Sequence, residues 1–265
     1  MLTKVVSANV AGNRIITLSG AITETVSALG LGSEIVAVDV TSTYPAHINK
    51  LPKVSKDRAI SAEGIISFSP TLVLAPENMI SKAVSYQLKS AGIKVVVIRQ
   101  EYSHPGTISF IRQVARATGS ITKGEELARQ TNLNILKALE TVRKNLKSPK
   151  VLFLYARGTG MMMVAGKETS MDALIKLAGG KNAVQGFSKY KPYTTEALIN
   201  ANPDVILMFD FGFSSLGGTE SILKMPGVSL TNAGKTKRII EMDSGLLSNF
   251  SVRLPEAIIQ LNAKW

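Results

Sequence analysis

Two stretches of the chain, residues 61–75 and 194–208, align without gaps at a constant offset of 133 residues. Each consists of a capping Ser or Thr, a glutamate in the first helical turn (Glu63 and Glu196), an apolar helix, a proline and an apolar strand. A helix that a proline ends just before a buried strand is typical of α/β folds. The match therefore predicts that the chain holds two copies of one α/β lobe.

Short apolar runs alternate with segments of helical spacing on both sides of these stretches. The strands expected from these runs lie at residues 14–18, 34–38, 71–75, 93–98 and 151–155. Strands of a parallel sheet are covered on both faces and are therefore almost wholly apolar, as these runs are. The alternation indicates parallel sheets with helices on both faces.

Residues 107–146 contain no strand-like run, and a long helix is expected there, after Gly119 and Gly124. Two α/β lobes joined by one long helix would leave a cleft, and clefts between domains are favoured ligand sites. The predicted parts are an N-terminal α/β lobe, a bridging helix and a C-terminal α/β lobe, over residues 1–119, 120–148 and 149–265.

Composition narrows the function. The 265 residues include no cysteine and only two histidines, His47 and His104, which excludes disulfides, thiolate chemistry and multi-histidine metal sites. The net charge is +12, but the lysines are dispersed and only 6% of residues are aromatic, so nucleic acid is not the expected partner. No run reaches the apolar length of a membrane helix, and the first residues lack the apolar core of a signal peptide.

Motifs of the common enzyme classes are missing from the sequence. The glycine-rich turns that follow residues 14–18 and 151–155 complete neither a dinucleotide-binding nor a phosphate-binding pattern. A nucleophile elbow and a zinc-protease motif are also absent. A binding protein without a catalytic cofactor is therefore favoured, and a Rossmann-like nucleotide-dependent enzyme is the outside alternative.

Several motifs, spread from Arg14 to Leu261, together carry a family resemblance. They are G-x-x-T-E-x-x-x-A-L-G-x-G at 20–32, KVLFLYARG at 150–158, the segment 163–207 and LPEAIIQL at 254–261. In this order they resemble the periplasmic substrate-binding proteins of ABC importers for haem, iron-siderophores and cobalamin. The resemblance implies two Rossmann-like lobes bridged by one long α-helix, with a ligand cleft between the lobes.

The C-terminal lobe is most similar to the haem-binding members, which implies capture of haem and its delivery to an ABC permease during iron acquisition. A siderophore or cobalamin carrier of the same architecture is the alternative. In such importers an acidic residue of each lobe meets arginines of the permease, and the matching positions are Glu63 and Glu196. The resemblance further implies a monomeric periplasmic protein, here a mature chain whose leader is absent from this sequence.

The expected ligand site departs from the family. Several haem-binding members carry Gly-Tyr-Met-Arg where this chain has Ser55-Lys56-Asp57-Arg58, so the arginine is kept and the iron-ligating tyrosine is lost. Some members offer a histidine where this chain has Arg157. Neither axial ligand carries over, and the metal ligand is open.

Three accounts of ligand binding remain. In the first, a substitute residue ligates haem iron, and Tyr155 is preferred because it ends a predicted parallel strand. In the second, Arg58 and Arg157 clamp the propionates, with Lys56 as a third cation. In the third, an iron chelate or another tetrapyrrole is held by cationic and aromatic side chains, Tyr193 among them. Other residues that could ligate iron are Tyr44, His47, His104, Met161, Met162 and Met163.

Overall fold

The computed structural model describes residues 13–56, 59–145 and 147–265. Its internal contacts divide the chain into two compact units, Met1–Arg99 and Gln100–Trp265. This division lies before the two helices that follow residue 103, so both of them belong with the second unit by their contacts. The predicted lobe boundaries, and the bridging role of residues 120–148, stay predictions. Arg58 lies outside the described residues.

The first unit contains one parallel sheet of four strands, in the order β2-β1-β3-β4. The central strands β1 and β3 are buried almost throughout, which suits a parallel sheet covered on both faces. The elements are β1 (Ile15–Thr17), α1 (Gly20–Val26), β2 (Ile35–Val38), α2 (Ala62–Ile66), β3 (Leu72–Pro76), α3 (Lys82–Ser90) and β4 (Lys94–Ile98), with short helical turns at Ser27–Leu31, Gly32–Glu34 and Ala46–Lys50.

The second unit contains a mixed sheet in the order β10-β9-β5-β6-β8, with β7 paired to β5. Its strands are β5 (Lys150–Ala156), β6 (Met162–Ala165), β7 (Lys181–Asn182), β8 (Tyr190–Pro192), β9 (Val205–Phe209) and β10 (Ile239–Met242). Its helices are α4 (His104–Ala117), α5 (Ile121–Lys144), α6 (Ser170–Leu177), α7 (Thr195–Ala201), α8 (Asp210–Ser215), α9 (Gly218–Leu223), α10 (Asn232–Lys235), α11 (Ser244–Ser248) and α12 (Leu254–Ala263), with a short turn at Val228–Leu230.

The expected α/β fold is confirmed, but the second sheet is not wholly parallel. β6 runs antiparallel to β5, and β8 runs antiparallel to β6. The turn between β5 and β6 has only five residues, which is too short for the crossover that a parallel pair needs. The expectation of parallel sheets is therefore right for the first unit and incomplete for the second.

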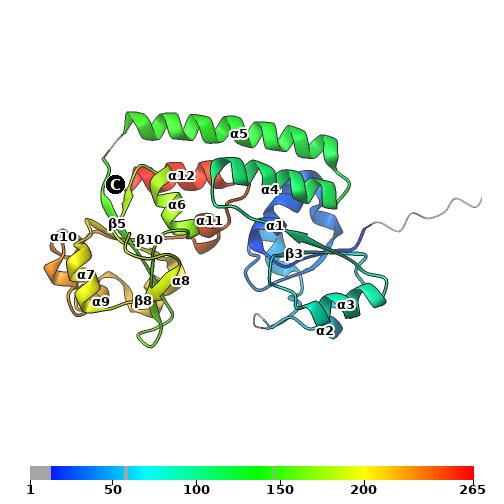
Figure 1. Cartoon of the computed structure of the whole chain (residues 1–265), viewed down its shortest axis with the longest axis horizontal. Coiled ribbons are helices and arrows are strands. Elements are labelled where there is room, and N and C mark those ends of the chain that lie inside the picture. Colours follow the sequence, from blue (N-terminus) through cyan, green and yellow to red (C-terminus); the bar gives the residue numbers. More distant parts are fainter. Residues whose placement is uncertain (1–12, 57–58, 146) are drawn as a thin grey trace, which may run out of the picture. The chain divides into compact units, whose positions relative to one another are not determined.

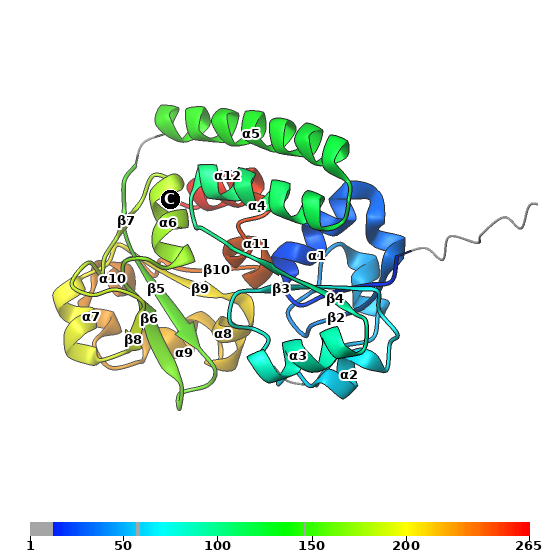
Figure 2. The same cartoon turned by 45° about the vertical axis from the view of Figure 1, so that its right-hand side comes forward.

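Helices cover both faces of the second sheet (Figures 1 and 2). Alternate residues of β5 point to opposite faces, so Val151 and Phe153 pack with side chains of α5, α6, α11 and α12, whereas Leu152 and Leu154 pack with those of α7, α8, α9 and α10. The sheet therefore separates two apolar cores, one on each face. The carboxyl ends of β5 and β9 lie side by side at one end of the sheet.

The long helix α5 contains Gly124, where the sequence predicts an interruption. α5 packs along α4 and α12, as Figure 1 shows. A Cβ atom built on Gly124 would lie 2.1 Å from the Cβ of Ala115 on α4. The glycine thus permits a close helix crossing that a larger residue would prevent, and it does not end the helix.

The internal repeat has the same local structure in both copies. β3 and β9 begin and end at positions related by the offset of 133 residues. Ser61 Oγ accepts a hydrogen bond from Gly64 N–H at 3.0 Å, and Thr194 Oγ1 accepts one from Ala197 N–H at 3.1 Å. The predicted N-cap, first-turn glutamate and helix–proline–strand order are therefore confirmed in each copy.

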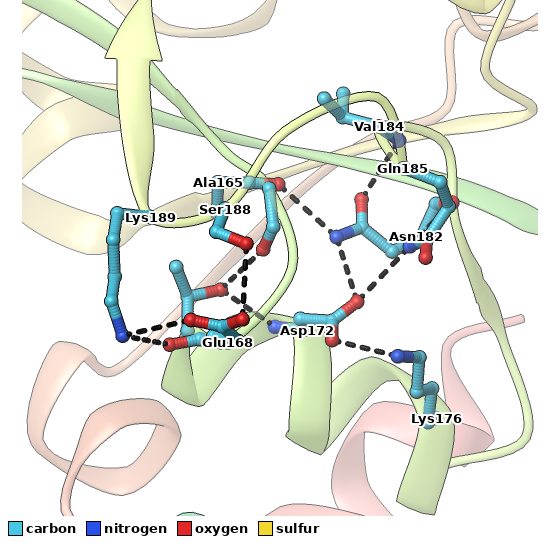
Figure 3. A network of polar contacts seen from close by, with 11 residues as sticks. Ala165, Glu168, Asp172, Lys176, Asn182, Val184, Gln185, Ser188 and Lys189 are labelled. Atoms are coloured by element: carbon cyan, nitrogen blue, oxygen red, sulfur yellow. Dashed lines mark hydrogen bonds and ion pairs between the residues drawn. The ribbon is translucent and has the colours of Figure 1, made fainter.

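A buried carboxylate ties α6 to β7 and the loop that follows it (Figure 3). Asp172 Oδ1 accepts hydrogen bonds from Asn182 Nδ2 at 3.0 Å and Gln185 Nε2 at 3.1 Å, and Lys176 Nζ lies 2.7 Å from Oδ2. Burial by itself would raise the pKa of Asp172, but the hydrogen bonds from Lys176, Asn182 and Gln185 outweigh it and hold the pKa below its ordinary value of 3.8.

We expect Asn182→Ala to lower the free energy of unfolding by about 1–3 kcal/mol at pH 7, since it removes a donor from a buried carboxylate. Asp172 has a depressed pKa, so its contribution is complete above its unfolded-state pKa and is lost as the pH falls through the folded-state value. Urea unfolding at pH 7 and near pH 3 should show the difference between the two proteins shrinking in acid. Asn134→Ala, at an exposed position of α5, is the matched control and should unfold like the parent.

Candidate ligand-binding site

Two neighbouring parallel strands bring aromatic side chains together where they end. β5 and β9 pair in parallel, so Tyr155 and Phe209, near their carboxyl ends, lie at the same edge of the sheet. Both point to the face that carries Phe153. The carboxyl ends of parallel strands are where open α/β sheets bind ligands, so this edge is the candidate site in the second unit.

Four rings form an aromatic cluster: Phe153, Tyr155, Phe209 and Phe211. Ring centroids are 4.7 Å apart for Phe153 and Phe209, 6.2 Å for Tyr155 and Phe209, and 5.8 Å for Tyr155 and Phe211, all edge to face. Phe153 is fully buried, Tyr155 is partly exposed, and Phe211 is 37% exposed. The cluster thus runs from the core to the surface, where it offers aromatic area to a ligand.

Arg157 completes this edge. Its Nε donates a hydrogen bond to the Tyr155 hydroxyl oxygen at 2.8 Å, and its guanidinium carbon lies 5.3 Å from the centre of the Phe211 ring. Arg157 itself is exposed. Within the described ranges, its terminal nitrogens have no hydrogen-bond partner, so they are free to bind an anion beside the aromatic surface.

Tyr190 interacts electrostatically with both Tyr155 and Tyr102. The pKa of Tyr190 is raised to about 12, mainly by burial and also by the neighbouring phenols of Tyr102 and Tyr155, while a hydrogen bond with Ser170 acts in the opposite direction. Burial also raises the pKa of Tyr102, whose ring meets Phe250 edge to face at 5.3 Å. Tyr102 and Tyr190 are therefore protonated at neutral pH and can donate hydrogen bonds to a ligand oxygen.

α8 is held against the turn that follows β5. The amide of Gly158 donates to Ser215 Oγ at 2.9 Å, and that hydroxyl donates to the carbonyl of Gly212 at 2.8 Å. A Cβ on Gly212 would lie 3.1 Å from the carbonyl oxygen of Ala156, so helix and strand are in close contact. These contacts fix Phe211 and Arg157, which belong to the two segments that they join.

Of the expected ligand residues, Tyr155 and Arg157 lie together. Tyr193 lies elsewhere: its hydroxyl donates to the carbonyl of Pro226 at 3.0 Å, its ring packs in the core on the other face of the sheet, and burial raises its pKa. Lys56 is exposed and belongs to the first unit. The roles predicted for Tyr193, Lys56 and Arg58 stay predictions.

The two histidines contact other groups. His104 Nε2 lies 2.7 Å from Asn132 Oδ1, which links α4 to α5, and His47 Nε2 would lie 3.3 Å from a Cβ on Gly32. In the part of the chain that the structure describes, no three His, Asp or Glu side chains gather so that they could hold a metal ion. The role of Tyr155 as an iron ligand stays a prediction.

Sequence reasoning missed Tyr102, Phe209 and Phe211. Phe209 ends β9, and Phe211 follows two residues later. A position at the end of an apolar strand, the signal that singled out Tyr155, would have identified both residues. What the sequence does not give is the neighbour of each strand: β9 lies beside β5 although some fifty residues separate them in the chain. Tyr155 and Arg157 are two residues apart. If the chain is taken to stay extended for one residue beyond β5, both side chains fall on the same face of the sheet.

Within the described ranges, no helix combines the length and the apolar character that crossing a membrane requires.

A family model and several known proteins match most of this chain. The model of the periplasmic binding protein family matches residues 15–246. The uncharacterized ABC transporter substrate-binding lipoprotein YvrC of Bacillus subtilis is 30% identical over 94% of this chain and 78% of its own length. The vitamin B12-binding protein of Vibrio parahaemolyticus is also 30% identical, over 75% of this chain and 71% of its own length.

Solved structures extend this similarity. The periplasmic haem-binding protein RhuT from Roseiflexus sp. RS-1, in apo form, is 39% identical with a TM-score of 0.91 over 96% of this chain and 97% of that one. The periplasmic haem-binding protein BhuT in complex with two haems is 37% identical with a TM-score of 0.90 over 95% of this chain and 97% of that one. The family expected from the motifs is thereby confirmed: the chain belongs to the periplasmic binding proteins.

Proposed function

We propose that this protein captures haem in the periplasm and delivers it to the permease of an ABC importer, without making or breaking a covalent bond. The observation that carries the proposal is the hydrogen-bonded pair of Tyr155 and Arg157 on an exposed aromatic edge. Similarity to RhuT and BhuT, both named as haem-binding, supports it over 95% or more of the chain.

The chemistry of the pair suits ferric haem. Tyrosinate is one of the axial ligands that proteins supply to haem iron. The hydrogen bond from the Arg157 guanidinium fixes the position of the Tyr155 hydroxyl oxygen, the atom that would bind Fe(III). Arg157 Nε is used in this way, and its terminal nitrogens remain for a propionate. Tyr155 and Arg157 thus unite the first two accounts of binding, with Tyr155 on the iron and Arg157 beside both groups.

The rest of the edge suits a porphyrin. Phe211 offers a partly exposed ring to a flat apolar ligand, and Tyr102 and Tyr190 offer phenolic hydrogens to its carboxylates. A ferric siderophore or cobalamin is the alternative ligand, supported by the B12-binding relative, which covers less of the chain than RhuT does. Monomeric state and the absence of a nucleic acid partner are part of the proposal.

Titration of the apo protein with hemin tests the proposal. We expect a saturable change in the Soret band, and weaker binding of iron-free protoporphyrin IX, because the latter cannot bond to Tyr155. Equal binding of both would mean that propionates and stacking hold the ligand without an iron bond. The proposal is wrong if hemin gives no saturable change while cyanocobalamin or a ferric hydroxamate binds tightly.

A further inference from the structure

We propose that the second unit carries a basic face that binds the anionic surface of a lipid bilayer. The face lies at the end of the second sheet where β5, β7, β9 and β10 begin. The choice of a bilayer as the partner rests on the proposed function, in which the protein delivers its ligand to a permease in a membrane. Six lysines with exposed side chains form the basic face: Lys147, Lys150, Lys181, Lys235, Lys237 and Lys264.

The parallel strands of the second sheet bring the first of these lysines together. Lys150 lies opposite Lys181 in the pairing of β5 with β7. The amide of Lys181 donates a hydrogen bond to the carbonyl of Pro149 at 2.8 Å, and the amide of Asp204 donates one to the carbonyl of Lys150 at 2.7 Å. The segments that enter β5, β7 and β9 are therefore bonded to one another at one edge of the sheet.

Arg238 connects the remaining lysines to this edge. Its carbonyl accepts a hydrogen bond from the amide of Ile206 at 3.1 Å, and its Nη2 donates one to the carbonyl of Lys264 at 3.0 Å. Lys235 and Lys237 belong to the segment that leads into Arg238 and β10. The end of α12 and the segment before β10 therefore join the same edge.

Positive charge accumulates at this edge. The segments that form it contain seven Lys or Arg residues and one acidic residue, Asp204. Asp204 accepts hydrogen bonds from the amide of Lys150 at 2.9 Å and from Asn232 Nδ2 at 2.9 Å, so its oxygens are already bonded within the fold. Repulsion between crowded like charges destabilises a fold, and an anionic partner would relieve it. The segments are 147–150, 179–181, 202–204, 231–238 and 262–265.

The residue types favour a bilayer over a nucleic acid. Lysine is a flexible point charge that needs no fixed geometry, whereas the planar fork of arginine suits bidentate recognition, and Arg238 is half-buried and bonded to a carbonyl. Unpaired bases stack on exposed aromatic rings. The aromatic residue of these segments is Trp265, which is buried and donates from Nε1 to the carbonyl of Ala178 at 2.7 Å. A cluster of lysines suits the negative surface potential of an anionic bilayer.

The basic face and the candidate ligand site lie at opposite ends of β5. Lys150 begins this strand and Tyr155 is five residues further on, which is about 16 Å along an extended strand. A bilayer that binds the lysines would therefore leave the aromatic edge uncovered. We expect removal of the lysine charges to leave hemin affinity unchanged.

Sedimentation of the apo protein with lipid vesicles tests the inference. We expect binding to vesicles of equal parts phosphatidylglycerol and phosphatidylcholine, no binding to phosphatidylcholine alone, and release in about 1 M salt, where the Debye length falls to about 3 Å. The triple variant Lys181→Gln, Lys235→Gln, Lys264→Gln should bind the anionic vesicles about 100-fold more weakly, since each lysine near such a surface contributes about fivefold. Each single variant should lose about fivefold.

A second triple variant, Lys89→Gln, Lys123→Gln, Lys137→Gln, is the matched control. It changes the net charge by the same amount at exposed positions of α3 and α5, and it should bind the vesicles like the parent protein. Thermal unfolding of both triple variants should match that of the parent, which separates a loss of binding from a loss of fold. Equal weakening in both triple variants would assign the effect to overall charge and overturn the basic face.

Competition and ligand titration separate the remaining possibilities. Free glycerol 3-phosphate in large excess should not release the protein from anionic vesicles; release would indicate a site for a single phosphate and overturn the inference. Tighter binding to duplex DNA than to the vesicles would overturn the assignment of a bilayer. If the parent protein does not bind hemin, the proposed ligand is wrong, but sedimentation of the apo protein still decides whether the basic face binds a bilayer.

Discussion

Replacing Tyr155 by phenylalanine is expected to weaken hemin binding by more than about 100-fold, since even partners outside the metal's direct ligands cost 10–100-fold in metal affinity. The substitution removes the oxygen and keeps the ring, so the contacts with Phe209 and Phe211 remain and the fold is preserved. Hemin titration followed by the Soret band measures the loss. The visible band of a ferric tyrosinate complex should disappear at the same time.

A control and a companion variant sharpen this result. Tyr86→Phe makes the same chemical change at a position that is 74% exposed on α3, and it should leave the titration unchanged. Arg157→Ala removes the donor to Tyr155 and is expected to lower hemin affinity by about 10–100-fold. Normal binding by Tyr155→Phe with loss in Arg157→Ala would show that the propionate contact dominates and that Tyr155 is not the iron ligand.

Reversing the charge of Glu63 or Glu196 to arginine is expected to lower haem uptake by more than about 100-fold, because like charges that face each other across an interface cost several kcal/mol. Hemin affinity should not change. Glu196 is exposed on α7, which packs on the face of the sheet opposite the aromatic cluster, and Glu63 is exposed on α2 of the first unit. Uptake of labelled haem by cells and titration of the purified variants measure the two quantities separately.

Glu126→Arg is the matched control for these reversals. It changes the net charge by the same amount at an exposed position of α5. Uptake should then stay close to that of the parent protein. An equal loss of uptake in Glu126→Arg would assign the effect to overall charge, and a loss of hemin affinity in Glu63→Arg or Glu196→Arg would contradict a docking role.

Much of the fold follows from local patterns in the sequence. Apolar runs that end in turn residues located β1, β2, β3, β4 and β5 to within a residue or two. The repeat predicted a cap at Ser61 and at Thr194, and each hydroxyl makes the expected bond because a helix leaves its first amides without partners. These features depend on neighbours in the chain, and sequence spacing reports them directly.

Features that depend on packing between distant segments were harder to predict. The sequence predicts a break between helices at Gly124, since glycine is a poor helix former. Its place inside α5 depends on the close approach of Ala115 from α4, which spacing does not reveal. The antiparallel pairing of β6 was missed for a similar reason: an apolar strand does not disclose the direction of its neighbour.

The candidate site divides in the same way. The place of Tyr155 at the end of an apolar strand predicts it as a ligand residue. Its hydrogen bond with Arg157 joins two residues that are only two positions apart, so it too is a local feature. Phe211 comes from a segment far away in the chain, and the pairing of β9 with β5 brings it against Tyr155. Tyr102 likewise precedes Tyr190 by many residues and interacts with it only through the fold. The spacing of residues in a single sequence does not reveal the order of the strands in the sheet.

The contacts that join α8 to the turn after β5 bear on how a ligand leaves. Ser215 bonds to both Gly158 and Gly212, and the helix touches the backbone of Ala156, so this part of the edge is rigid before anything binds. A preorganised surface loses little conformational entropy on association, which slows departure rather than arrival. Rapid release of the ligand then requires energy from outside the second unit. In an ABC importer, ATP hydrolysis is a source of that energy.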